Sequence, residues 1–169
     1  ECVLDGGPAE VGIVSAIVDL SGGKAVLLRP GWIAASDIER TLGAPLAAPA
    51  EDAPRAPGTL AAHYAPETPL MLVEGDQLAE IAATLTRQGR KVAALAFSKP
   101  RPTLPGVTWH AAPRDAAGYA RTLYASLRTL DAEGCDAILV ERPPRETAWT
   151  AINDRLSRAA AGSSVPDSP

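Results

Sequence analysis

The chain has 169 residues, with 16 Lys and Arg against 20 Asp and Glu, a formal net charge of −4, and 46% apolar residues. This length suits one ordinary domain or two small ones, and the lack of a basic excess argues against tight binding of nucleic-acid phosphates by this chain alone. Its apolar runs are far shorter than the roughly 20 residues that cross a bilayer, so we expect no membrane association.

The first part of the chain contains short runs rich in Val, Ile and Leu, separated by glycine-containing turns. We expect strands over Glu1–Leu4, Ser15–Leu20 and Ala25–Leu28. A short helix should follow, capped by Ser36 or Asp37 and ended by Gly43. Residues 1–44 are therefore predicted to be the trailing part of an α/β domain, too short to bury a core unaided. Because the chain also begins with Glu rather than Met, we expect a fragment of a longer protein.

Residues 45–67 are predicted to be an extended linker. Six of the sixteen prolines lie between Pro45 and Pro69, mixed with alanines and charged residues, and the stretch shows neither a helical nor an alternating period. A linker of this kind joins two folded units.

After the linker, strand patterns alternate with longer helical patterns. The predicted strands are Leu70–Glu74, Val92–Phe97, Val107–His110 and Ala137–Glu141. The predicted helices begin at Asp76, at Asp115 and near Thr147, which can cap the last one. This order predicts a small, Rossmann-like parallel sheet with helices on its faces over residues 68–162, followed by a disordered tail over 163–169.

Two polar residues in the first part are candidates for ligand contact. Ser15 lies among apolar neighbours on a predicted strand, where an unpaired hydroxyl costs about 1 to 3 kcal/mol. Arg29 ends the next strand, before Pro30-Gly31, and its planar guanidinium suits phosphate or carboxylate. The alternatives are an ordinary strand-end serine and a structural salt bridge, and the sequence does not fix whether the two side chains share a face.

A histidine and a tyrosine are adjacent in the linker. His63-Tyr64 could contact a ligand on the neighbouring domain or pack on that domain's surface. His110, beside Trp109, indicates packing or an exposed strand edge. No His, Cys or carboxylate cluster predicts a metal site. Cys2 and Cys135 lack metal-ligand spacing and no apolar signal segment opens the chain, which favours a reducing, cytoplasmic setting.

Two glycine-containing junctions could bind anions. Gly6-Gly7-Pro8 could form a nest of backbone N–H groups, although a plain turn explains it better. Gly75-Asp76 lies at a strand-to-helix junction, where α/β folds often bind anions, but the glycines are too few for a dinucleotide motif.

Several segments together resemble the C-terminal portion of long-form threonylcarbamoyl-AMP synthases. In chain order they are Asp5-Gly6-Gly7-Pro8, the run GIVSAIVDL over 12–20, Leu28-Arg29-Pro30-Gly31, PGTLAAHYAP over 57–66, and the ending AINDRL over 151–156 with Arg158-Ala159-Ala160. That family joins a YrdC-type catalytic domain, through a linker with a PG…HYxP motif, to a smaller Rossmann-like domain. The resemblance implies that 1–44 is the end of the YrdC-like domain.

The resemblance implies a nucleotidyltransferase that converts threonine, bicarbonate and ATP to threonylcarbamoyl-AMP and pyrophosphate. Mg²⁺ would be bound mainly through the phosphates, and the product would pass to proteins that build threonylcarbamoyladenosine in tRNA. By position, Ser15 matches the serine near threonine and Arg29 the arginine that holds ATP phosphates. Tyr64 and His63 match the linker motif that folds over the ATP site.

Two departures from the family pattern limit what this chain should do alone. Val14 and Ala16 stand where the family has Glu and Thr beside the serine, which removes polar groups from the threonine site. The family's basic motif and Ser-x-Asn motif lie upstream of anything in this chain, so we expect the fragment alone to be inactive, and we assign it no catalytic residue. The alternative is a noncatalytic, small-ligand-binding or regulatory module formed by residues 68–162.

Overall fold

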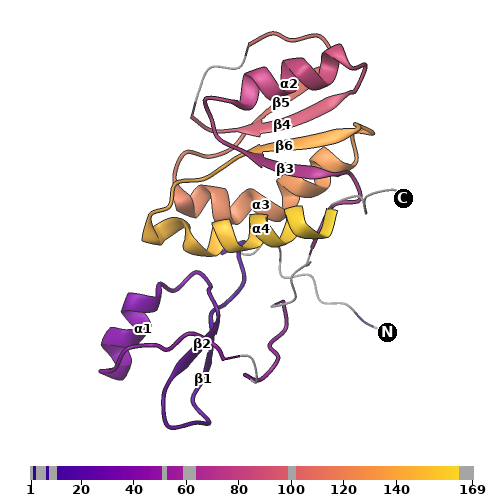
Figure 1. Cartoon of the computed structure of the whole chain (residues 1–169). Helices are drawn as coiled ribbons and strands as arrows, with labels where there is room; N and C mark the ends of the chain where they lie inside the picture. The colour runs from indigo at the N-terminus through magenta and orange to yellow at the C-terminus, as the bar shows by residue number, and fades with distance from the viewer. Residues whose placement is uncertain are drawn as a thin grey trace.

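A computed structural model describes residues 2, 7, 11–50, 53–58, 64–98 and 102–163, which form a small N-terminal part, a connecting segment and a larger sheet domain (Figure 1). The expected strand over 1–4 lies outside the described residues except for Cys2, as do the Gly6 and Pro8 positions, His63 and the 164–169 tail.

The N-terminal part is a β-hairpin followed by one helix. Strands β1 (Ile17–Asp19) and β2 (Val26–Arg29) pair antiparallel, with an irregularity between Ile17 and Val18. Helix α1 (Ala35–Leu42) ends at Gly43, whose left-handed backbone (φ 69°) places its N–H 2.8 Å from the Glu39 carbonyl. The expected cap at Ser36 or Asp37 is wrong, because the N-cap is Ala34 and no side chain caps the helix.

Few side chains of this part are buried within it. None of the α1 residues is buried, and Trp32 and Ile33 are 45% and 57% exposed. The prediction that so short a segment cannot bury a core of its own is confirmed.

The linker begins later than its composition indicates. Ala47 forms a parallel bridge with Val26, donating to the Ala25 carbonyl at 2.8 Å and accepting from the Leu27 N–H at 3.0 Å. Because Ala47 adds to the open edge of β2, the start of the predicted linker belongs to the hairpin.

The sheet domain confirms the predicted alternation of strands and helices. Its elements are β3 (Leu70–Val73), α2 (Leu78–Arg87), β4 (Val92–Ala96), β5 (Val107–Ala111), α3 (Ala116–Asp131), β6 (Ala137–Glu141), a 3₁₀ turn (Thr147–Trp149) and α4 (Thr150–Ser163). The four strands are parallel, in the order β3-β6-β4-β5. Every residue of the central strands β4 and β6 is buried, as expected for a parallel sheet covered on both faces.

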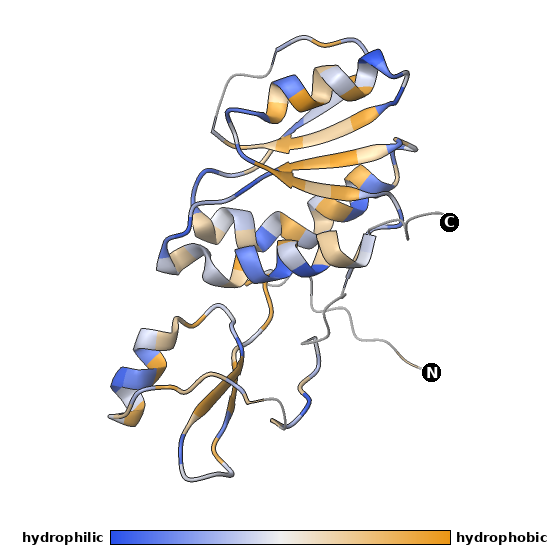
Figure 2. Cartoon of the chain, in the orientation of Figure 1, coloured by the Kyte–Doolittle hydropathy of each residue, from blue (hydrophilic) through white to orange (hydrophobic). Residues whose placement is uncertain are grey.

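Helices cover the two faces of the sheet unequally (Figures 1 and 2). Helix α2 covers one face through Leu78, Ala82 and Leu85. Helices α3 and α4 cover the other face, and their buried side chains form the larger core cluster. The outer surface of α3 and α4 faces the N-terminal part, so this pair of helices lies between the sheet and the hairpin (Figure 1).

Helix ends in the sheet domain test three further expectations. Asp115 caps α3, accepting the Gly118 N–H at 2.7 Å, as predicted. Thr147 does not cap α4; it begins the 3₁₀ turn that precedes that helix. Ser163, expected in the tail, is a buried residue of α4 whose hydroxyl accepts the Leu70 N–H at 2.9 Å.

Among the described residues, no helix has the length and apolar character needed to span a membrane.

Candidate functional site

Arg29 connects three segments of the chain. It ends β2 and is 8% exposed. Its Nε and Nη2 atoms donate to the Ser15 carbonyl at 3.1 and 2.9 Å, and Nη2 also lies 3.2 Å from the Ser15 hydroxyl. Its Nη1 atom donates to the Pro57 carbonyl of the linker at 2.5 Å. Ser15 and Arg29, which the sequence singled out separately, therefore meet in space.

The contact between Ser15 and Arg29 depends on a glycine. A Cβ on Gly31 would lie 2.0 Å from the Ala16 nitrogen and 2.3 Å from the Ser15 carbonyl carbon, closer than any side chain allows. Just beyond it, the Trp32 N–H donates to the Val14 carbonyl at 3.3 Å. The backbone after Arg29 thus crosses directly over residues 14–16 and fixes the guanidinium against Ser15.

The partners of Arg29 are carbonyls and a hydroxyl. The alternative of a structural salt bridge is not what the described residues show, because no carboxylate lies within ion-pair distance of this guanidinium. A buried cation that faces only neutral acceptors retains its attraction for an anion.

Arg155 holds the linker from the opposite side. It lies on α4, and its side chain is 1% exposed. Its Nη1 atom donates to the Gly58 carbonyl at 2.7 Å, and Nη2 pairs with Asp154 at 3.1 Å. Burial lowers the pKa of Arg155 and the neighbouring Asp154 opposes that shift.

Arg155 was quoted only within the ending AINDRL and was given no role, although the sequence contains a signal for one. Ile152, Leu156 and Ala159 form a helical stripe that is fully buried, and position 155 falls on the same stripe. A charged residue on an apolar stripe needs a partner, and here the partner comes from the linker, which sequence periodicity could not place.

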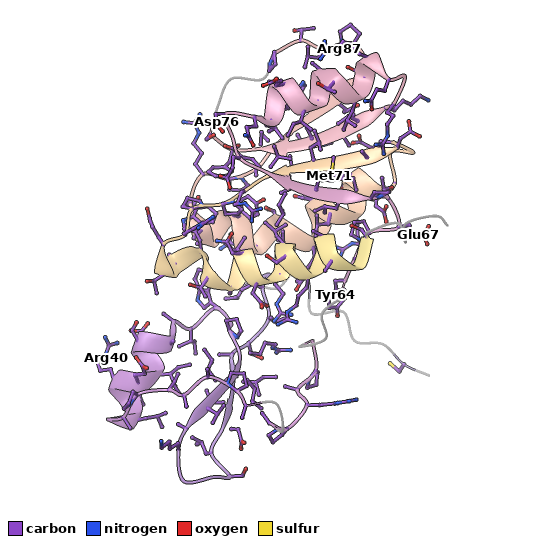
Figure 3. All side chains as sticks on the ribbon, in the orientation of Figure 1. Arg40, Tyr64, Glu67, Met71, Asp76 and Arg87 are labelled. Carbon is purple, nitrogen blue, oxygen red and sulfur yellow. The ribbon has the colours of Figure 1, made fainter. Side chains whose placement is uncertain are left out.

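Tyr64 packs on the sheet domain. Its ring lies 5.0 Å from that of Tyr124 on α3, at 49°, and its backbone is left-handed (φ 53°), which is uncommon for a bulky residue. The side chain is 65% exposed and lies beside α3 and α4 (Figure 3). The expected packing on the surface of the sheet domain is therefore observed, and the contact with a ligand stays a prediction.

Tyr124 lies at the centre of this region. Its hydroxyl is buried without a hydrogen-bond partner, and burial raises its pKa, partly offset by the nearby Arg155. A cavity of about 220 Å³ opens beside it, lined by Tyr64, Ala65, Pro66, Tyr124, Leu127, Arg128 and Asp131. Sequence analysis treated Tyr124 only as part of a helix.

Asp131 anchors the end of the linker. Its carboxylate accepts the Glu67 N–H at 3.1 Å and the Thr68 N–H at 2.9 Å, across the 63 residues that separate it from Thr68. Burial raises the pKa of Asp131, but the hydrogen bonds with Thr68 and Glu67 together outweigh it and lower the pKa below the ordinary value of 3.8.

We expect Asp131→Asn to remove a pH-dependent part of the stability. A lowered folded-state pKa stabilises the fold above the unfolded-state pKa, and this contribution disappears as the pH falls through the folded-state pKa. Urea unfolding of the native chain and the variant should differ at about pH 7 and converge as the pH falls below about 4. An equal difference at both pH values would contradict the anchoring role.

The carboxyl edge of the sheet is occupied by a buried carboxylate. Glu141, at the end of β6, accepts the N–H groups of Phe97 and Ser98 at 2.7 and 3.0 Å, and the Ser98 hydroxyl also contacts it. A Cβ on Gly75 would lie 2.5 Å from Glu141 Oε1. The expectation of an anion site at Gly75-Asp76 is therefore not supported, because a carboxylate fills and repels that position.

The remaining candidates are structural. His110 pairs with Glu133 at the edge strand β5, and both side chains are half-buried, which agrees with the packing or edge interpretation. No group of three or more His, Cys, Asp or Glu within the described ranges could hold a metal ion.

The fold and the site define an α/β module in which a hairpin precedes a parallel-sheet domain. Arg29 of the hairpin and Arg155 of the sheet domain both donate hydrogen bonds to the linker that joins the two parts. Residues 33–161 match the family described as the threonylcarbamoyl-AMP synthase C-terminal domain. The chain therefore belongs to this family, and the resemblance seen in its motifs is confirmed.

Individual relatives agree with this assignment. The chain is 30% identical to threonylcarbamoyl-AMP synthase of Pyrococcus abyssi and 30% identical to that of Bacillus subtilis, in each case over 95% of this chain and 49% of the relative. The enzyme of Schizosaccharomyces pombe is 31% identical over 94% of this chain and 45% of its own length. The chain thus spans about half the length of the curated relatives it matches.

Two solved structures share the fold. The crystal structure of P. abyssi Sua5 complexed with L-threonine superposes with a TM-score of 0.81 at 28% identity, covering 96% of this chain and 50% of that one. A P. abyssi Sua5 variant in which an adjacent His-Tyr pair is replaced by alanines gives 0.77 at 26% identity, covering 94% and 48%.

Proposed function

We propose that this chain is the C-terminal half of an L-threonylcarbamoyladenylate synthase, a cytoplasmic nucleotidyltransferase that makes the precursor of threonylcarbamoyladenosine in tRNA. In this proposal residues 1–44, together with Ala47 at the edge of β2, end the YrdC-type catalytic domain. The rest of 45–67 forms the linker, and 68–162 form the Rossmann-like domain. The observation that carries it is the contact of Arg29 with both Ser15 and Pro57, which joins two residues that the resemblance assigns to the substrates with the start of its linker motif.

The chemistry requires two anions to be held together. The threonine amine adds to the carbon of bicarbonate with loss of water, giving a carbamate. A carbamate oxygen then attacks the α-phosphorus of ATP, and the bond to the bridging oxygen breaks, releasing pyrophosphate. The protein must orient the carbamate and the triphosphate and offset the charge on the departing group.

The residues of this chain suit the orienting role. Ser15 would contact threonine through its hydroxyl, and Arg29 would donate to ATP phosphate oxygens from a site that excludes most water. Its Nη1–H groups face the Pro57 carbonyl, so phosphate binding would compete with the linker for the same donors. The linker motif that contains His63 and Tyr64 would shield a hydrolysable mixed anhydride from water, as the resemblance implies.

Magnesium would accompany ATP. Around Arg29 the described residues offer carbonyls, hydroxyls and cations, and the nearby Asp154 is paired with Arg155 and Arg158. These residues do not supply ligands for Mg²⁺, so the ion would be held by the phosphates themselves.

The relatives support the substrate class. One P. abyssi structure carries L-threonine, and another carries changes at an adjacent His-Tyr pair. This sequence contains one such pair, His63-Tyr64, in its linker.

The test is pyrophosphate release by this chain joined to the upstream half encoded in its gene. We expect release to require threonine, bicarbonate and ATP together, with threonylcarbamoyl-AMP formed in equal amount. The same assay on the present chain alone should give none. ATP consumption at the same rate with and without threonine, or no turnover by the joined chain, would contradict the proposal.

A further inference from the structure

Consecutive linker carbonyls are held by buried arginines from opposite parts of the molecule. Arg29 of the hairpin donates a hydrogen bond to the Pro57 carbonyl at 2.5 Å, and Arg155 of the sheet domain donates one to the Gly58 carbonyl at 2.7 Å. Gly58 is itself buried and has a left-handed backbone (φ 75°), which turns the two carbonyls toward different partners.

The arrangement of Arg155 is costly for a merely structural residue. Its guanidinium is almost completely buried, its Nε atom has no hydrogen-bond partner, and its carboxylate Asp154 is shared with Arg158. Burying a cation with incomplete compensation destabilises a fold, and apolar residues of similar volume would pack on α4 at lower cost. What the charge adds is a strong, directed hydrogen bond to the linker.

We propose that Arg155 is a positioning residue through which the sheet domain sets the place of the linker over the Ser15–Arg29 site. The hydrogen bond to Gly58 fixes the carbonyl next to the one that Arg29 holds, so the linker segment between them has little freedom. Arg155 acts on the site through the linker and not by touching substrate. The sheet domain then has a role in the reaction. That role rests on the proposed function, whereas the anchoring of the linker by Arg155 does not.

Trypsin cleavage after Arg55 measures this anchoring directly in the present chain. Arg55 is exposed and lies two residues before Pro57, so cleavage of the Arg55–Ala56 bond requires the anchored segment to open. A hydrogen bond from a charged donor stabilises the closed linker enough that its loss makes opening of the segment about tenfold more frequent. The fragment beginning at Ala56 should therefore appear about tenfold faster in Arg155→Met. Mass spectrometry identifies that fragment among the other tryptic products.

The control is Arg142→Met, which removes another ion-paired arginine of the same domain. Arg142 pairs with Glu74 at 2.9 Å, at the carboxyl edge of the sheet, and should leave the cleavage rate unchanged. If Arg155→Met does not fold, Arg155→Gln serves instead, because it keeps a polar amide but lacks the terminal nitrogens that reach Gly58 and Asp154. A cleavage rate equal to that of the native chain in the folded variant would overturn the proposal.

The second arm separates this proposal from the proposed function. In the chain joined to its upstream half, Arg155→Met should lower turnover about tenfold while Arg142→Met does not. Faster cleavage with unchanged turnover in an active enzyme would overturn the positioning role. An inactive native enzyme would refute the proposed function, and the cleavage rates would still decide whether Arg155 anchors the linker.

Discussion

Replacing Arg29 by Met is expected to weaken ATP binding at least tenfold in the chain joined to its upstream half. The guanidinium is the cation that the proposed function assigns to the phosphates, and charge-assisted hydrogen bonds of this kind contribute about 1.5 to 3 kcal/mol each. The variant should also unfold at lower urea concentration, because the Ser15 and Pro57 carbonyls lose their donor. Calorimetric titration of ATP and urea unfolding measure the two effects.

Arg40→Met is the matched control. Arg40 belongs to the same part of the chain, but its side chain is 78% exposed and pairs with Asp37 at the surface. Exposed pairs of this kind contribute roughly 0 to 1 kcal/mol, so neither ATP affinity nor stability should change appreciably. If Arg29→Met binds ATP as tightly as the native protein, Arg29 does not hold the phosphates.

Glu141→Gln should destabilise the sheet domain by about 2 to 4 kcal/mol. The carboxylate accepts two backbone N–H groups and contacts a hydroxyl at a position that is 3% exposed. Both N–H groups bind the same oxygen, Oε2, so an amide oxygen can still accept them, but without the negative charge each hydrogen bond contributes about 1 kcal/mol less. The NH₂ group also takes the place of the oxygen that accepts the Ser98 hydroxyl. Urea unfolding followed by circular dichroism gives the difference in free energy.

Asp76→Asn is the control for that measurement. Asp76 is an exposed acid at the same end of the sheet (Figure 3), and its neutralisation should change stability by less than about 0.5 kcal/mol. Equal unfolding midpoints for Glu141→Gln and Asp76→Asn would show that the buried carboxylate does not hold the carboxyl edge together.

The elements that sequence analysis predicted well are those whose local pattern and tertiary environment agree. Strand Ala137–Glu141 consists of four apolar residues followed by Glu141, in a sheet buried on both faces, and its predicted bounds are those observed. The Asp115 cap was predictable because the side chain and the N–H it accepts lie three residues apart.

The errors arise where distant contacts decide the structure. Ala47 looked like linker because nothing in its neighbourhood shows that the edge of β2 is open to it. Thr147 looked like a helix cap, but the chain enters α4 through a 3₁₀ turn that buries Trp149 in the core. Local propensity is a weak guide where packing against another element outweighs it.

In the candidate site, too, locally determined features were predicted and features that depend on distant contacts were not. Ser15 and Arg29 were predicted as candidates because each is a polar residue after or among apolar ones. The expected burial of Ser15 on a strand is wrong, because Ser15 is exposed and precedes β1, and its contact with Arg29 depends on Gly31 crossing residues 15 and 16. Arg155 and Asp131 were not predicted, because their linker partners lie 97 and 63 or 64 residues away in the sequence. No periodicity within one helix reports a contact over such a separation.

The most direct test is a crystal structure of the joined chain with threonine and a non-hydrolysable ATP analogue. We expect Arg29 to donate to a phosphate oxygen, with the Ser15 hydroxyl on the threonine side and Arg155 still bound to the Gly58 carbonyl. Contacts of Arg29 to Ser15 and Pro57 alone, with the nucleotide bound elsewhere, would contradict the proposed site.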